Sequence, residues 1–206
     1  MNEAVKDDIA YLRQVAEQGQ RLPLNGGEFG VLWGSLYALS AIYAYAVLTQ
    51  LIDLPAFSIG LAFLLPIPVG GLAHWILARR MLGASGALSF GNKTSAAAWM
   101  AVGVAGCMLS VVLFTAFGLA LTSIPAGYLF GALQAVVFEM YAVAYATTAQ
   151  VSGDAKQYIF SAWALLTALI SLLVMNSYQM FLVMAAGLMV SAVVPGLMTR
   201  TQNSSK

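Results

Sequence analysis

Six long runs of apolar residues make up most of the chain, separated by short polar connections. Crossing the hydrocarbon core of a bilayer, which is about 30 Å thick, takes about 20 helical residues. Backbone groups cannot stay unpaired in lipid, and the runs are continuous rather than alternating, so the pattern predicts helices and not barrel strands. We expect an all-α polytopic membrane protein with six transmembrane helices within residues 25–199. The runs lie at about 28–51, 56–78, 95–118, 126–149, 157–175 and 179–198.

Residues 1–24 show a different pattern, a single apolar stripe on a charged segment. The stripe has helical spacing, at Val5, Ile9, Leu12 and Ala16. This predicts an amphipathic helix that lies on the membrane surface or docks on a partner. The segment lacks the apolar stretch of a signal peptide. Pro23 and the Gly26-Gly27 pair predict a turn into the first run, and residues 200–206 form a polar tail.

Composition and charge add an orientation to this picture. The chain is 61% hydrophobic and 8% charged, whereas soluble proteins have about 25% charged residues. Basic residues gather in cytoplasmic loops, and with the N-terminus inside all of them fall on one side. We therefore expect both termini in the cytoplasm. The basic residues are Lys6, Arg13, Arg21, Arg79, Arg80, Lys93, Lys156, Arg200 and Lys206.

Two short similarities between the halves of the chain predict a 3+3 inverted repeat. The first run contains LWGSL followed by IYAYA, and the fourth contains LFGAL followed by MYAVA. The third contains AGCMLSVV at 105–112, and the sixth contains AGLMVSAV at 186–193. Many secondary transporters have such repeats. The alternative is chance, because apolar sequences match easily and the second run has no visible mate in the fifth.

Glu139 is the one acidic residue in the middle of an apolar run, within VVFEMYAV. An ionised carboxylate in hydrocarbon costs several kcal/mol, so such a residue normally pairs, meets water or stays protonated. Gln134 lies about 140° and Tyr141 about 200° around the helix from it, so the fourth run does not form one polar stripe. A partner has to come from elsewhere, and His74 is the intramembrane candidate, about 8 Å away in depth by helical rise. We consider a proton- or cation-binding site at Glu139, His74, Gln134 and Tyr141, or a protonated acid that fixes packing.

The second run contains a probable break, LPIPVGGLAHW, with Pro66, Pro68, Gly70 and Gly71. Each proline removes a backbone donor and kinks a helix. In membranes the freed carbonyls are paired by neighbouring groups or water, and ion and substrate sites are often built in this way. The alternative is a structural kink with a close helix contact at the glycines.

Small residues at helical spacing predict close helix packing at two further places. These are Gly103 with Gly106 in the third run, and Gly127 with Gly131 in the fourth. Such faces let helices approach closely, either within one chain or between subunits. The single cysteine, Cys107, is interpreted as a small core residue.

Several functional classes have no support in the sequence. No cofactor is expected, although His74 with small residues on the preceding turn could also be an axial ligand to a tetrapyrrole. No metal-binding or catalytic motif occurs, so the chain is not expected to be an enzyme and no catalytic residue is predicted. A net charge of +1 gives no basic patch for nucleic acid.

The segment DIAYLRQVAEQGQRLPLNGGEFGVLWG, from Asp8 to Gly34, resembles the start of a family of small bacterial inner-membrane proteins. The shared pieces are a short cytoplasmic helix, a Gly-Gly turn and an LWG motif entering the first membrane helix. The resemblance implies a multi-pass protein of the bacterial cytoplasmic membrane. It transfers neither an activity nor functional residues.

Two hypotheses about function follow. The first is a non-catalytic membrane subunit or adaptor, whose partners are the lipid bilayer and another integral membrane protein or a second copy of itself. The second is a small secondary transporter or channel, in which Glu139 binds the coupling proton or cation and the broken second helix lines the path. The first is preferred because one intramembrane charge is little polar lining for a transporter.

Overall fold

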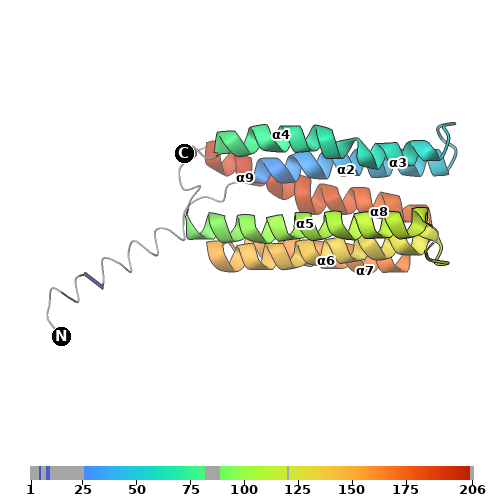
Figure 1. Ribbon diagram of the computed structural model, residues 1–206. Helices are drawn as coiled ribbons and strands as arrows, with labels where there is room; N and C mark the ends of the chain where they lie inside the picture. The colour runs from blue at the N-terminus through green and yellow to red at the C-terminus, as the bar shows by residue number, and fades with distance from the viewer. Residues whose placement is uncertain (1–4, 6–7, 10–25, 82–88, 120, 205–206) are drawn as a thin grey trace.

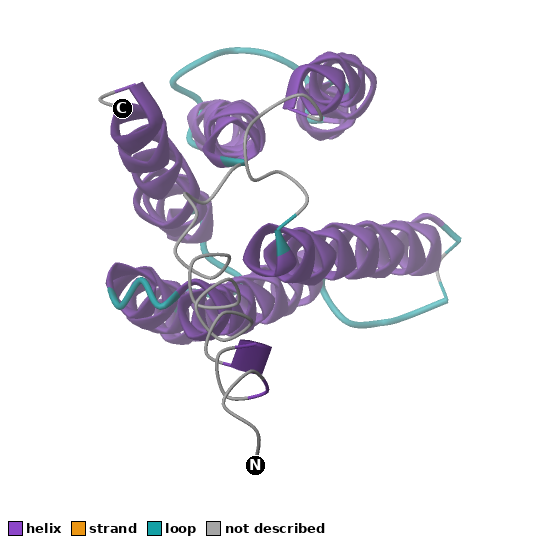
Figure 2. Ribbon diagram, turned by 90° about the vertical axis from the view of Figure 1, so that its left-hand side faces the viewer, coloured by secondary structure: helices purple, strands orange, loops and turns teal. Residues whose placement is uncertain are grey.

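The structure is a computed structural model that describes residues 5, 8–9, 26–81, 89–119 and 121–204. Within these residues every regular element is a helix, as Figures 1 and 2 show. Six helical stretches are long and apolar enough to cross a membrane. The predicted all-α polytopic fold is therefore confirmed. The predicted N-terminal amphipathic helix lies almost wholly outside the described residues.

The membrane spans begin and end close to the predicted positions. Two of them are interrupted, since the second is split into α3 and α4 and the sixth into α8, a π-helical turn η1 and α9. The third begins at Phe90, earlier than the predicted 95, because Ser95 faces the fourth span and bonds Thr148 there, Oγ to Oγ1, at 3.0 Å. The elements are α2 Gly27–Leu48, α3 Phe57–Leu64, α4 Pro66–Met81, α5 Phe90–Gly118, α6 Ala126–Ser152, α7 Lys156–Leu173, α8 Gln179–Leu188, η1 Met189–Val193 and α9 Val194–Ser204.

The first and fourth spans have similar neighbours. The first, α2, packs on α3 and α4 and also on α8, η1 and α9 of the last span. The fourth, α6, packs on α7, the span that follows it, and on α5. Each half thus lends its third span to the first span of the other half, as an inverted repeat would require. The contact of α7 with α8 and η1 has no comparable counterpart between α4 and α5 among the described residues, and the 3+3 repeat stays a prediction.

The closest helix contact joins the start of the first span to the end of the last. A Cβ atom added at Gly27 would lie 2.5 Å from the carbonyl oxygen of Gly196, and one added at Gly30 would lie 2.7 Å from that of Ala192. Gly34 continues the same face, again against Ala192. Only glycine lets two helix backbones approach this closely, which in lipid gains van der Waals contact that the hydrophobic effect does not supply. Gly26, with φ of 110°, forms the turn that leads into this face.

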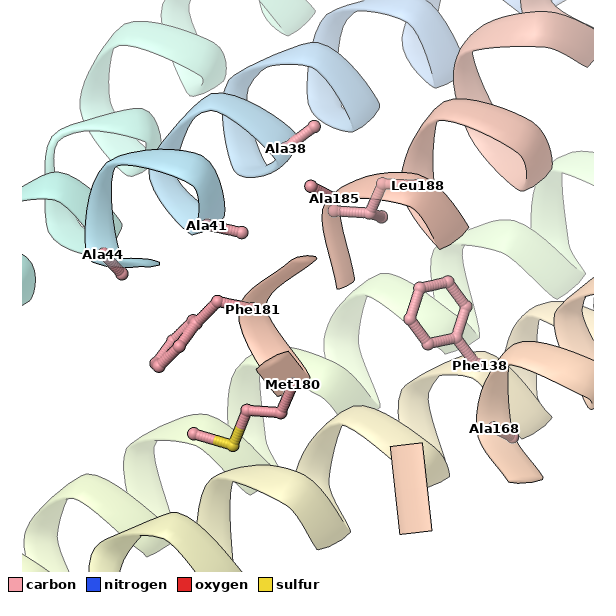
Figure 3. Packing of buried hydrophobic residues seen from close by; sticks show 9 residues of the cluster. All are labelled: Ala38, Ala41, Ala44, Phe138, Ala168, Met180, Phe181, Ala185 and Leu188. Carbon is pink, nitrogen blue, oxygen red and sulfur yellow. The ribbon is translucent and has the colours of Figure 1, made fainter. Parts of the chain in front are cut away.

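The core is made largely of alanine. Ala38 and Ala41 of α2 face Ala185 and Leu188 of α8 in Figure 3, and the ring of Phe138 from α6 reaches the same cluster. Phe138 is 1% exposed, one of the most deeply buried large side chains. The small residues bring the helices together, and a few large side chains fill the space between them.

The predicted break in the second span is present, between α3 and α4. Pro66 has no N–H for the carbonyl of Ala62, four residues earlier. Ser40 of α2 donates its hydroxyl to that carbonyl at 2.6 Å. Gly70 packs against the ring of Trp33, whereas Gly71 has no other residue nearby to meet a Cβ. A neighbouring helix therefore takes up the carbonyl of Ala62, and the residues around it form a structural kink.

Replacing Ser40 with alanine is expected to lower the free energy of unfolding by about 1 kcal/mol, because the Ala62 carbonyl loses its donor. The measurement is reversible unfolding in mixed micelles. Ser110→Ala is the matched control, since the Ser110 hydroxyl bonds only a carbonyl of its own helix, that of Gly106. Equal losses in the two variants would contradict the capping role of Ser40.

Candidate functional site

Glu139 lies at the middle of α6 and points away from the bundle. It is exposed, as are Ala132, Val136 and Val143, which share its side of the helix. The opposite side of α6 is buried and carries Phe138. We call this outer stripe of Ala132, Val136, Glu139 and Val143 the Glu139 face. A carboxyl group thus stands in a face that composition and depth assign to lipid or to another membrane protein.

No described residue of the chain donates a hydrogen bond or an ion pair to Glu139. On either side of it α6 packs against α5 and α7, so that three helices form a layer with the Glu139 face on its outer surface. The expected intramembrane partner, His74, is on α4, which packs against α2 and has no comparable packing with α6 among the described residues. The pairing of His74 with Glu139 considered from the sequence is therefore wrong for the isolated chain.

His74 is engaged by aromatic residues of the first span. The indole N–H of Trp33 donates to Nδ1 of His74 at 3.1 Å. The ring of Phe29 lies 4.2 Å from the imidazole ring, centroid to centroid. Accepting at Nδ1 places the proton of the neutral ring on Nε2. Gly70, which was expected to leave room for a macrocycle, is covered by the Trp33 ring. His74 therefore helps to join α4 to α2.

Gln134 and Tyr141 lie on the inner side of α6. The amide of Gln134 donates to the hydroxyl of Ser171 at 2.7 Å, and that hydroxyl donates to the carbonyl of Thr167. Tyr141 packs edge-on against Trp99, with ring centroids 5.2 Å apart. The four candidate residues thus lie in different places: Glu139 outside, His74 on the second span, and Gln134 and Tyr141 inside. They do not form one proton or substrate site.

A second helix break, in the sixth span, was not predicted. Pro195 has no N–H for the carbonyl of Ser191, and the turn before it widens into the π-helix η1. Tyr145 of α6 donates its hydroxyl to this carbonyl. The signal in the sequence was Pro195 itself, inside an apolar run. Both breaks are thus paired by hydroxyl groups of other helices, Ser40 for Ala62 and Tyr145 for Ser191.

The interior of the described part of the chain is polar in small, paired groups. Ser161 of α7 donates to the carbonyl of Ala142 at 2.8 Å, which adds to the pairs already described between α6 and its neighbours. Every buried side-chain nitrogen or oxygen atom in the described residues has a hydrogen-bond partner. Such interhelical bonds stabilise membrane bundles by about 0.6 kcal/mol each, and by up to about 1.7 kcal/mol. These groups hold helices together.

The predicted small-residue faces differ from one another. A Cβ at Gly127 would lie 2.7 Å from Cα of Asn176, and one at Gly131 would lie 2.5 Å from Cβ of Met175, so both pack on the segment after α7. Gly106 has only Val137 nearby, at 3.9 Å, and Gly103 has nothing within 4 Å. Cys107, expected in the core, is exposed. The Gly103 side of α5 is therefore open in the isolated chain.

The described residues contain no group of three or more His, Cys, Asp or Glu side chains that could hold a metal ion. What stands out chemically is one carboxyl group on an outer helix face, without a partner in its own chain. Comparison with protein families, with curated proteins and with solved structures found no match to this chain.

Proposed function

We propose that this multi-pass membrane protein is a non-catalytic subunit or adaptor of the bacterial inner membrane, which packs against another integral membrane protein through the Glu139 face. The observation that carries the proposal is the position of Glu139: mid-membrane, exposed, and without a donor among the described residues. An acidic residue facing lipid costs several kcal/mol, and a partner that supplies a hydrogen bond or a counter-charge removes much of this cost.

The shape of the face supports the same proposal. Val136 and Val143 flank Glu139 one helical turn away on either side, and Ala132 is one turn further from it along the face. These side chains are small, so a partner helix could approach closely. Proteins that bind through an outer helix face present such small residues around a polar one.

The transporter alternative has less support from this geometry. Coupling carboxylates face a polar path inside the bundle, whereas Glu139 is on the outer side of α6, opposite Phe138. The breaks at Pro66 and Pro195 have carbonyls that Ser40 and Tyr145 already pair. If transport depended on Glu139, Glu139→Gln would abolish a proton- or cation-dependent flux while leaving expression normal.

The test is photocrosslinking in the native membrane, with a photoreactive amino acid at Val143. We expect one adduct of constant mass, which disappears when Glu139→Leu is added. The matched control is the same probe at Leu165, an exposed residue on the lipid-facing side of α7. A Val143 probe that yields no adduct, or the same adducts as Leu165, would contradict the proposal.

A further inference from the structure

We infer that the partner at the Glu139 face is a transmembrane helix that carries a basic side chain, lysine or arginine, at the middle of the membrane. This rests on the proposed function, since it names the chemistry of the partner at the same face. It follows from the depth of Glu139, from the shape of the face around it, and from the charges elsewhere in the chain.

Depth excludes the usual escape of a charged side chain to the membrane surface. Glu139 is thirteen residues from each end of α6, Ala126–Ser152, which is about 20 Å of helix in either direction. A glutamate side chain cannot reach the headgroups over that distance. Its counter-group has to be brought to it within the hydrocarbon core.

The described part of the chain offers no base at that depth. Arg79 and Arg80 end α4, Lys93 begins α5 and Lys156 begins α7. Arg79 is engaged at that end, with its guanidinium 3.8 Å from the centre of the Trp75 ring. These positions are span ends on the side predicted to be cytoplasmic, whereas Glu139 is at a span centre. A base for Glu139 therefore comes from another molecule.

The occupant is a helix because nothing else presents a side chain to lipid-exposed α6 at this depth. Unpaired backbone groups are excluded from hydrocarbon, so a segment lying along α6 must satisfy its own hydrogen bonds. Ala132, Val136 and Val143 leave a narrow apolar seat on either side of the carboxyl group. Close backbone approach at these residues brings a long side chain of the partner to Glu139.

A basic partner fits this site better than a second copy of the chain. Two copies with the same orientation would bring Glu139 against its own equivalent, and like charges force at least one of the two acids to stay protonated. A lysine or arginine lets the carboxylate ionise, because each charge stabilises the other where the dielectric is low. Charge complementarity therefore selects a cationic helix.

The experiment measures binding of a defined probe to the full-length protein in phosphatidylcholine vesicles. The probe is a dye-labelled helix of leucine and alanine with one lysine at its centre, and the control probe has leucine there. Energy transfer from a donor on the protein reports association. We expect the lysine helix to bind at least tenfold more tightly than the leucine helix, to the wild type and to Glu139→Asp alike. Glu139→Gln should bring it down to the leucine level.

Three outcomes would overturn the inference. The lysine helix could bind no better than the leucine helix, it could bind Glu139→Gln as well as the wild type, or unlabelled copies of the protein could displace it fully. A loss of the lysine preference with a persistent Val143 adduct in cells would reject the basic partner and leave the adaptor function standing. Loss of that adduct would reject the adaptor function itself.

Discussion

The Gly196→Leu variant is expected to be less stable than the wild type by about 3 kcal/mol, because overpacking a well-packed contact forces backbones apart. A Cβ at position 196 would meet the carbonyl oxygen of Gly27, and it would lie 2.8 Å from Cγ2 of Val31. The obstacle is largely backbone, which cannot rotate away as a flexible side chain could. The whole seam between α2 and α9 would have to open.

The measurement for Gly196→Leu is reversible unfolding in mixed micelles, followed by circular dichroism. The matched control is Gly103→Leu, the same change in another membrane helix, where nothing lies within 4 Å of the added Cβ. We expect the control to unfold like the wild type, because its side chain enters the lipid-facing surface. Similar losses in both variants would mean that helix propensity, and not the seam, determines the effect.

The six spans were predictable because lipid imposes them. Once a run is long and apolar, a helix is the only backbone arrangement that satisfies its polar groups. The ends were less predictable, because polar residues continue a helix when another helix pairs them. Ser95 does this in α5 by bonding Thr148, and a hydropathy window excludes it.

The direction that each helix faces was harder to predict. In a soluble protein the buried side is apolar and the exposed side polar, whereas in lipid both sides are apolar. The angle between Glu139 and Tyr141 placed them on different sides of one helix, but not which side was inward. Alanines could have shown this: Ala135, Ala142 and Ala149 are all buried and recur every seven residues along α6.

The pairing of the helix breaks depends on tertiary structure. A proline shows which carbonyl is freed, and Pro66 was recognised on that basis. Which hydroxyl reaches the carbonyl depends on the neighbouring helix and its rotation, which no local pattern in the sequence specifies. For this reason neither Ser40 nor Tyr145 was among the residues predicted to matter, although each joins two spans.

Replacing Tyr145 with phenylalanine is expected to lower the free energy of unfolding by about 2 kcal/mol. The change removes one hydroxyl and leaves the shape of the ring. It takes away the donor of the Ser191 carbonyl, next to a proline that cannot replace it, and a buried acceptor left unpaired costs about 1–3 kcal/mol. The position is also buried, so water does not compensate.

Tyr141→Phe is the matched control for Tyr145→Phe, one helical turn away on the same helix. Both rings pack edge-on against Trp99, with centroids 5.2 Å away for Tyr141 and 4.7 Å for Tyr145. The Tyr145 hydroxyl bonds another span, whereas that of Tyr141 makes no hydrogen bond to a described residue. The same unfolding measurement should therefore show a loss for Tyr145→Phe and little change for Tyr141→Phe. A double variant with Pro195→Ala separates the causes: the restored N–H can bond the Ser191 carbonyl, so the loss on removing the Tyr145 hydroxyl should shrink in that background, and an undiminished loss would mean that the hydroxyl acts elsewhere.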